Sequence, residues 1–268
     1  MQLQILLGIY ATVLGLIVGS YLNVVIYRVP LGLSTVLPRS RCPHCGAAIR
    51  AVDNVPVLSF LLLRGRCRQC GARISWRYPA VEAATAALFL ACFLRFGISP
   101  EAPVAALLAA LLLALAMIDY DHMILPDVLT YPGIALGILL QPLVSWARLW
   151  EGPWGAVAGA ALGALAGAGL LLAVWTLWYL WRHEEGMGLG DVKMLALLGA
   201  FLGWRGMLVS LFAAALLGSV AGLTLMAFRG ADLKARLPFG VFLALGGLIA
   251  LFAGGPLVRA YLAYAHGV

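Results

Sequence analysis

Eight long apolar segments set the main constraint on how this chain can fold. They lie at about 3–26, 79–95, 102–118, 127–146, 154–181, 191–203, 206–228 and 238–262. Most are long enough to cross the roughly 30 Å hydrocarbon core of a bilayer, which takes about 20 helical residues. Overall, 63% of the residues are hydrophobic, against 18 Lys and Arg and 11 Asp and Glu. The sequence therefore predicts an all-α, polytopic membrane protein with about eight transmembrane helices.

Basic residues are distributed unevenly between the polar segments. The segment from Arg28 to Arg77 contains nine arginines and a single acid, Asp53. Because Lys and Arg concentrate in the cytoplasmic loops of membrane proteins, we expect this segment in the cytoplasm. The net charge of +7 is then mainly a signal of topology. Membrane lipid is therefore an expected partner, and nucleic acid is not.

The polar segment divides the chain into three predicted regions. These are a first transmembrane helix at 1–28, a cytoplasmic loop domain at 29–78 and a transmembrane domain at 79–268. Two predicted helices separate Asp119 from Asp191, and an even number of crossings returns the chain to the same side. We therefore expect both aspartates at the cytoplasmic face, on the side of the loop domain.

Four of the five cysteines form two Cys-x2-Cys pairs in the loop domain, Cys42 with Cys45 and Cys67 with Cys70. A glycine follows each pair and lets the backbone fold back, so that amide groups face the sulfurs. Two such turns supply four thiolates in a tetrahedral arrangement, which is typical of structural zinc. The alternative is two disulfides, which reducing conditions in the cytoplasm disfavour.

Two aspartates stand at the ends of predicted membrane helices. Asp119 lies in the motif IDYDH at 118–122, and Asp191 ends the motif GMGLGD at 186–191. A carboxylate beside lipid is costly to keep and usually marks a functional site. Two that meet across a helical bundle can share a proton and act as an acid–base pair. Structural and ion-coupling roles are the alternatives.

The two helix ends differ in their dipoles. Asp191 follows glycines at a helix N-terminus, where free amides favour a carboxylate, whereas Asp119 lies near the negative end of its helix. We therefore expect one shared proton, with Asp191 the more ionised member, although coupled carboxylates titrate as a pair. Gly188 and Gly190 are expected to line a substrate cleft, because glycine lets a substrate strand approach the backbone closely.

Other polar and small residues have more ordinary predicted roles. Asp121 follows Asp119 by two residues, and spacing alone does not separate them. We expect Asp127 to cap its helix and Glu82 to complement the dipole in the first turn of its own. In the segment 154–181, glycines recur at every fourth residue on one face, which predicts close packing against a neighbouring helix.

Several motifs, taken in chain order, resemble those of the type IV prepilin peptidases, which are membrane aspartic peptidases of the GxGD type. They are GSYLNVVIYRVP at 19–30, the double Cys-x2-Cys loop, RYPAVE at 77–82, IDYDHMILPD at 118–127, GMGLGD at 186–191 and LPFG at 237–240. The resemblance covers nearly the whole chain, from residue 19 to about 245.

This resemblance implies cleavage of the leader peptide of type IV prepilins and pseudopilins, at the cytoplasmic face of the bacterial inner membrane. Residues 79–268 would form the peptidase domain. Carried over by motif, the catalytic pair is Asp119 and Asp191, one activating water while the other protonates the leaving amine. The tetracysteine loop resembles that of members which also methylate the new N-terminus with S-adenosylmethionine. Methylation is therefore expected, but no cofactor-binding residue is legible in the sequence.

Four alternatives remain at this stage. The first is a peptidase that does not methylate. The second is a polyprenyl-phosphate transferase, in which Asp119 and Asp121 hold magnesium and Lys193 is the one basic candidate for a phosphate clamp. The third is an ion-coupled transporter, which would place the acids at mid-membrane. The fourth is a non-catalytic scaffold, in which replacing either aspartate would leave processing intact.

Overall fold

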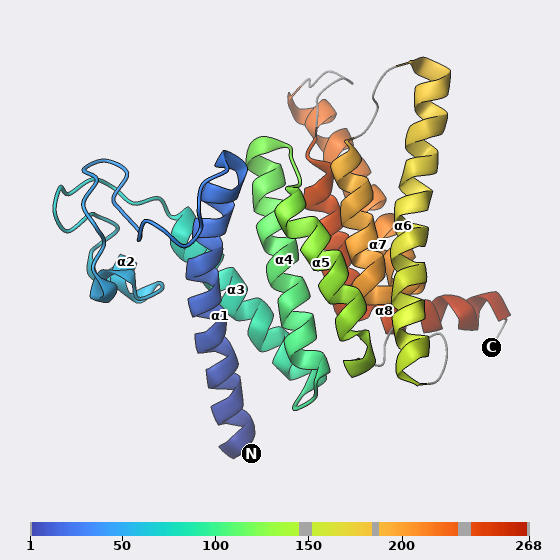
Figure 1. Cartoon of the computed structure of the whole chain (residues 1–268), viewed down its shortest axis with the longest axis horizontal. Coiled ribbons are helices and arrows are strands. Elements are labelled where there is room, and N and C mark those ends of the chain that lie inside the picture. The colour runs from blue at the N-terminus through green and yellow to red at the C-terminus, as the bar shows by residue number, and fades with distance from the viewer. Residues whose placement is uncertain (1, 145–151, 184–187, 230–236, 267–268) are drawn as a thin grey trace. The chain divides into compact units, whose positions relative to one another are not determined.

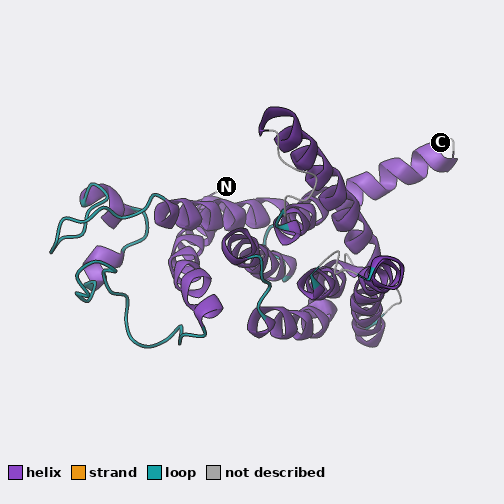
Figure 2. Cartoon of the chain, turned by 90° about the horizontal axis from the view of Figure 1, so that it is seen from above, coloured by secondary structure: helices purple, strands orange, loops and turns teal. Residues whose placement is uncertain are grey.

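The computed structural model describes residues 2–144, 152–183, 188–229 and 237–266, and all regular elements in these ranges are helices (Figures 1 and 2). Six are long and apolar enough to cross a membrane. These are α1 (Gln2–Arg28), α3 (Arg77–Phe96), α4 (Glu101–His122), α6 (Pro153–Arg182), α7 (Leu189–Arg229) and α8 (Phe239–His266). The shorter apolar helix α5 (Asp127–Leu140) continues into η3 (Gln141–Leu143). The predicted all-α membrane fold is confirmed.

The helix α7 combines two of the predicted helices, because the chain turns back within it. Gly203 has non-helical backbone angles (φ 68°, ψ 177°), in a region that favours glycine. A straight helix would separate Gly190 from Gly222 by about 48 Å. Instead, Leu125 lies against both Gly190 and the first turn of α8, while Gly222 faces Leu237, just before α8. Figure 1 accordingly shows α7 as two arms, in orange.

Two compact units make up the chain, residues 1–114 and 115–268, and the division falls within α4. In the first unit, α1 and α3 approach closely at two glycines. A Cβ added to Gly15 would lie 2.6 Å from Cα of Ala86, and one added to Gly19 would lie 2.7 Å from Cα of Glu82. Only glycine permits this backbone contact, which is typical of membrane helix pairs.

The loop between α1 and α3 contains the short helices η1 (Val29–Leu31), η2 (Ala51–Asn54) and α2 (Leu58–Leu62). The buried carboxylate of Glu82 accepts a hydrogen bond from the Val57 amide (2.7 Å), and Asn23 donates to the Tyr78 carbonyl (3.1 Å). The prediction that Glu82 lies in the first turn of its helix is wrong, because α3 already begins at Arg77. Its carboxylate instead holds the loop against α3.

In the second unit, the glycine face predicted for 154–181 packs against α7. A Cβ added to Gly163 would collide with the Gly199 carbonyl, and one added to Gly167 would lie 2.6 Å from the Leu195 carbonyl oxygen. The predicted packing role is therefore confirmed for these two glycines. They bring α6 within backbone contact of the α7 arm that carries Asp191.

Candidate functional site

The four paired cysteines lie on two turns of the same form. In the first turn, the Cys42 amide donates to the Ala47 carbonyl and the Gly46 amide donates to the Cys42 carbonyl, both at 2.9 Å. The second turn repeats this pattern around Cys67 and Gly71. Both glycines have positive φ, at 70° and 71°, so each chain reversal depends on the residue that follows the pair.

The sulfur atoms of the two turns converge on one point. All four lie within 4.8 Å of one another, and Sγ of Cys42 is 3.8 Å from Sγ of Cys70. Tetrahedral zinc with Zn–S distances of about 2.3 Å needs sulfur separations of roughly 3.8 Å. Because all five cysteines are free, the disulfide alternative is wrong for this structure. The sulfur cluster fits a four-coordinate metal ion.

Backbone amides also favour metal-binding thiolates in this cluster. Hydrogen bonds from the Cys45 and His44 amides lower the pKa of Cys42 to about 6. For Cys70, the Ala72 amide lowers the pKa, but desolvation and hydrogen bonds with the other three sulfurs outweigh it and raise the pKa to about 11. Four neighbouring thiolates repel one another, and a divalent cation at their centre removes that repulsion.

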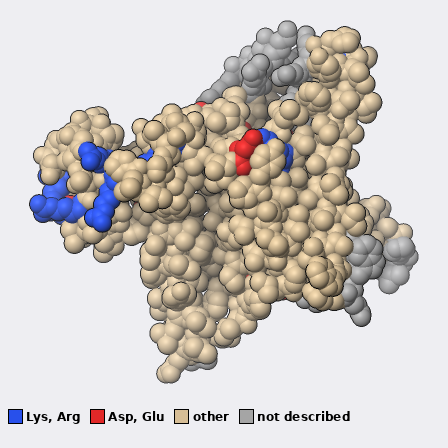
Figure 3. Space-filling view, viewed as in Figure 1, with Lys and Arg blue, Asp and Glu red and all other residues tan. Residues whose placement is uncertain are grey.

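Basic side chains gather over the loop that carries the cysteines (Figure 3). Exposed arginines of this surface include Arg41, Arg64 and Arg66. Arg68 forms an ion pair with Asp53, with 2.6 Å between Nη2 and Oδ1, and it holds the pKa of the Asp53 carboxyl below its usual value. Asp53, the one acid between Arg28 and Arg77, therefore already forms an ion pair with an arginine of the loop.

The second unit brings Asp119 and Asp191 together. Asp119 lies near the end of α4 and Asp191 in the first turn of α7, and only 5% and 8% of their surfaces are exposed. They are close enough for their charges to interact. Asp121 is exposed instead, which separates it from Asp119. Both buried acids lie at helix ends rather than in the middle of a helix, which argues against the transporter alternative.

The first turn of α8 also contacts this aspartate pair. The Val241 amide donates to Oδ2 of Asp119 (3.2 Å), and the Gly240 amide donates to the same carboxylate. The sequence reasoning missed this role. Its only signal was the motif LPFG at 237–240, which was noted for its resemblance and given no function.

The two glycines before Asp191 have different surroundings. A Cβ added to Gly190 would lie 3.1 Å from Cβ of Leu125, so this glycine allows close packing. Among the described residues, a Cβ added to Gly188 would meet only the Gly190 amide nitrogen, at 3.9 Å. Apart from its chain neighbours, no other described residue therefore lies within 4 Å of that position. The start of the motif, Gly186-Met187, lies outside the described residues, as do Glu184 and Glu185.

Asp127 does not cap α5 as predicted. No side-chain capping hydrogen bond forms at this helix end, where Pro126 is the N-cap residue. The Asp127 carboxylate instead forms an ion pair with Lys193, whose ammonium group also lies 5.7 Å from the centre of the Tyr131 ring. Lys193 is thus paired with an acid, which argues against its use as a phosphate clamp.

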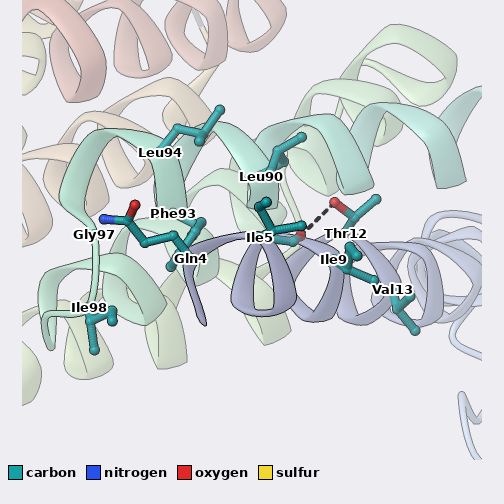
Figure 4. A pocket seen from close by; sticks show the side chains of 11 residues that line it. Gln4, Ile5, Ile9, Thr12, Val13, Leu90, Phe93, Leu94, Gly97 and Ile98 are labelled. Atoms are coloured by element: carbon teal, nitrogen blue, oxygen red, sulfur yellow. Dashed lines mark hydrogen bonds between the residues drawn. The ribbon is translucent and has the colours of Figure 1, made fainter. Parts of the chain in front are cut away.

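An apolar groove in the first unit has no comparable chemistry. Its volume is about 600 Å³, and it lies between α1 and α3 (Figure 4). Its lining is mainly aliphatic and aromatic, with Gln4 and Thr12 as polar members, and the Thr12 hydroxyl donates to the Gly8 carbonyl (2.8 Å). No ionisable side chain lines it. Of the described residues, only the four cysteines form a group of three or more potential metal ligands.

Together, these features define a multi-pass membrane protein with a cysteine cluster and a buried pair of aspartates. Residues 13–96 match the bacterial peptidase A24 N-terminal domain, and residues 106–223 match the type IV leader peptidase family. The chain belongs to the type IV leader peptidase family.

Curated relatives that match the chain have the name prepilin leader peptidase/N-methyltransferase. The Pseudomonas putida protein is 41% identical over 269 residues, which cover 91% of this chain and 90% of the relative. The Stutzerimonas stutzeri protein is 38% identical, with coverage of 96% and 94%, and the Pseudomonas aeruginosa protein is 38% identical, with 94% and 92%. No solved structure matches the chain.

Proposed function

We propose that this protein cleaves the leader peptide of type IV prepilins and pseudopilins and then methylates the new N-terminus. The observation that carries the peptidase activity is the buried pair Asp119 and Asp191, brought together from α4 and α7. Membership of the type IV leader peptidase family and the names of the relatives support both activities.

Asp119 and Asp191 are proposed as the catalytic pair. One carboxylate activates a water molecule, and the other protonates the amine that leaves when the peptide bond breaks. Both groups are nearly buried, so the substrate backbone must come to them. Gly188 is exposed and is not covered by another described residue, which supports a substrate cleft there, while Gly190 lies against Leu125.

Zinc is the metal proposed for the loop, held by Cys42, Cys45, Cys67 and Cys70. The convergence of the four sulfurs and the amide hydrogen bonds to Cys42 support this assignment. The ion would supply structural cross-linking to a loop that has little regular structure. S-adenosylmethionine is proposed as the methyl donor, because the relatives are named as N-methyltransferases.

The proposed location is the bacterial inner membrane, with the loop and the aspartate pair facing the cytoplasm. The nine arginines between Arg28 and Arg77 support this orientation. The transferase alternative is less well supported, because Asp119 and Asp121 differ in burial and Lys193 pairs with Asp127.

Purified protein in detergent, incubated with a prepilin that retains its leader, tests this function. We expect Asp119→Asn and Asp191→Asn each to lower the cleavage rate by about 100-fold or more, because each removes an acid–base group. Asp121→Asn is the matched control and should cleave at close to the wild-type rate. With S-adenosylmethionine, the wild-type product should gain the mass of one methylene group.

Two results would contradict parts of this proposal. Normal cleavage by folded Asp119→Asn and Asp191→Asn proteins would favour the scaffold or transporter alternatives. Cleavage without any mass gain in the presence of S-adenosylmethionine would reduce the function to that of a peptidase alone.

A further inference from the structure

The first turn of α8 surrounds one carboxylate of the pair and not the other. The amides of Gly240 and Val241 both donate to Asp119, with the Val241 nitrogen 3.2 Å from Oδ2. The first amides of any helix lack a partner four residues back in that helix. The Val241 amide is shared between the Pro238 carbonyl, at 3.3 Å, and the carboxylate of Asp119, an acid from α4 that lies 122 positions away and acts here as a capping side chain.

The first turn of α8 also leaves little room for a side chain at Gly240. A Cβ added to Gly240 would lie 2.8 Å from Oδ2 of Asp119 and 3.2 Å from Cδ1 of Leu125. Leu125 is itself buried, with 6% of its surface exposed. A side chain at position 240 would therefore press on the Asp119 carboxylate, which is the nearest group to it.

Asp191 has a different environment. It is 8% exposed and feels the charge of Asp119, but no described residue donates a hydrogen bond to its carboxylate. Its own helix dipole favours an anion only through the field at the N-terminus. Direct amide donors stabilise a carboxylate more strongly than the field of a helix end does, because each hydrogen bond is made to a charged group. When two acids share one proton, the acid that accepts hydrogen bonds from amides is the one that is ionised.

We infer that the first turn of α8, through its amides at Gly240 and Val241, is a positioning element of the proposed peptidase reaction. Its amides hold Asp119 as the carboxylate that activates water, and they leave Asp191 to carry the proton. This assignment rests on the proposed function, and it reverses the order expected from the helix dipoles of α4 and α7 alone.

In the resulting hydrolysis, Asp119 accepts one proton and Asp191 donates another. Asp119 takes a proton from water while the water oxygen bonds to the carbonyl carbon of the scissile peptide. Asp191 gives its proton to the amide nitrogen, and the carbon–nitrogen bond breaks to release a carboxylic acid and an amine. One water is consumed, and transfer of a proton from Asp119 to Asp191 restores the starting state.

The other described charged groups at the C-terminal end of α4 and in the first turns of α5 and α7 are in an ion pair or exposed. On α5 and α7, Asp127 and Lys193 form an ion pair with each other. On α4, Asp121 and His122 are exposed. The first turn of α8 contains no charged residue. The amides of α8 are therefore the groups whose removal should alter the titration seen in cleavage.

The test removes the amide hydrogen without removing the acid. Val241→Pro lacks the N–H, and proline is tolerated in the first turn of a helix. Val241→Ala shortens the side chain but keeps the N–H, so a defect that is specific to Val241→Pro reports the loss of that N–H, which donates to both Asp119 and the Pro238 carbonyl. We expect Val241→Pro to have a kcat about 10- to 100-fold below that of Val241→Ala, with little change in KM. The acidic limb of its pH–rate profile should move to higher pH by about one unit, because the anion has lost a donor.

Gly240→Ala tests the restricted space, and we expect the same loss of kcat at an unchanged KM. Gly254→Ala is its control on the same helix, because the added Cβ would be 3.8 Å from Ala250, an ordinary contact. Methylation of a prepilin cleaved beforehand reports whether each variant is folded. If Val241→Pro does not fold, Gly240→Ala decides the question alone.

The inference and the proposed function fail in different ways. The inference is overturned if folded Val241→Pro or Gly240→Ala cleaves with the wild-type kcat and an unshifted acidic limb, while Asp119→Asn remains inactive. If Asp119→Asn and Asp191→Asn both cleave normally, the proposed function itself has failed.

Discussion

On a helix, two residues two positions apart point to nearly opposite sides, and this separates the roles of Asp119 and Asp121. Asp119 is buried beside Asp191, whereas Asp121 is exposed. The same kind of local geometry acts in the loop, where Gly46 and Gly71 adopt positive φ so that two pairs of sulfurs converge. Single residues thus decide which side chains are able to take part in chemistry.

Replacing Cys42 by serine should remove the metal from the loop. We expect the zinc content to fall from about one ion per chain, the thermal stability to decrease, and methylation to suffer more than cleavage. Metal analysis, thermal unfolding and the two activity assays check this, with Cys92→Ser as the control because Cys92 lies outside the cluster. Equal loss of both activities would argue against a division of labour between the loop and the membrane helices.

Zinc binding by the metal-free loop should depend on pH in a defined direction. The pKa of Cys70 is raised to about 11, so zinc binding at neutral pH must displace its proton. The pKa of Cys42 is lowered to about 6, so its thiolate also becomes protonated as the pH falls below that value. We therefore expect proton release on zinc addition at neutral pH, and binding that weakens as the pH falls below about 11 and more steeply below about 6. Binding that is independent of pH would contradict a thiolate site.

At the scale of elements, close backbone contact between α6 and α7 positions the arm that carries Asp191. Gly163 and Gly199 face each other so closely that a Cβ on either would collide with the carbonyl of the other. Such contacts replace the hydrophobic effect as a source of helix association inside a membrane. The glycines of α6 therefore hold in place the arm that carries Asp191.

A methyl group at Gly163 should weaken this helix pair. We expect Gly163→Ala to destabilise the protein by about 1–3 kcal/mol through overpacking, and to lower cleavage through the displaced α7 arm. Gly169→Ala, on the same helix, is the matched control because nothing lies within 4 Å of the added Cβ. Thermal unfolding in detergent compares them, and equal stability of the two variants would show that the contact contributes little.

At the scale of the whole chain, the chain reversal at Gly203 sets the number of membrane crossings. With α5 and the two arms of α7 counted separately, the six long spans become eight predicted crossings. The two compact units, 1–114 and 115–268, do not test the predicted regions 1–28, 29–78 and 79–268, which stay predictions. The cytoplasmic position of the loop likewise follows from its arginines alone.

Native thiols in the loop provide a test of this orientation. Cys45 and Cys70 are exposed, whereas Cys92 is buried in α3. After removal of metal by a chelator, we expect a membrane-impermeant thiol reagent to label the protein in inverted vesicles and not in intact spheroplasts. Lysis with detergent is the control for access. Labelling in sealed spheroplasts would place the loop, and with it the predicted face of the aspartates, on the opposite side.

The sequence alone determined the features that depend on neighbouring residues. Apolar segments of membrane length predict the helices, and two Cys-x2-Cys-Gly runs predict the turns, because each signal lies within a few consecutive positions. The glycine face of α6 was predictable for the same reason, since it follows from the period of one helix. The broken backbone of α7 lies at Gly203, which is the last residue of the predicted segment 191–203, just before the gap that precedes 206–228.

Only the tertiary structure decided which groups meet across the bundle. It paired Asp127 with Lys193, placed Glu82 on the Val57 amide, and set the first turn of α8 against Asp119. Each of these contacts joins residues far apart in the chain, and their strength depends on burial and on hydrogen-bond geometry. The helix dipoles predicted from the sequence therefore favoured Asp191 as the anion. The hydrogen bonds that amides of α8 donate to Asp119 favour Asp119 instead.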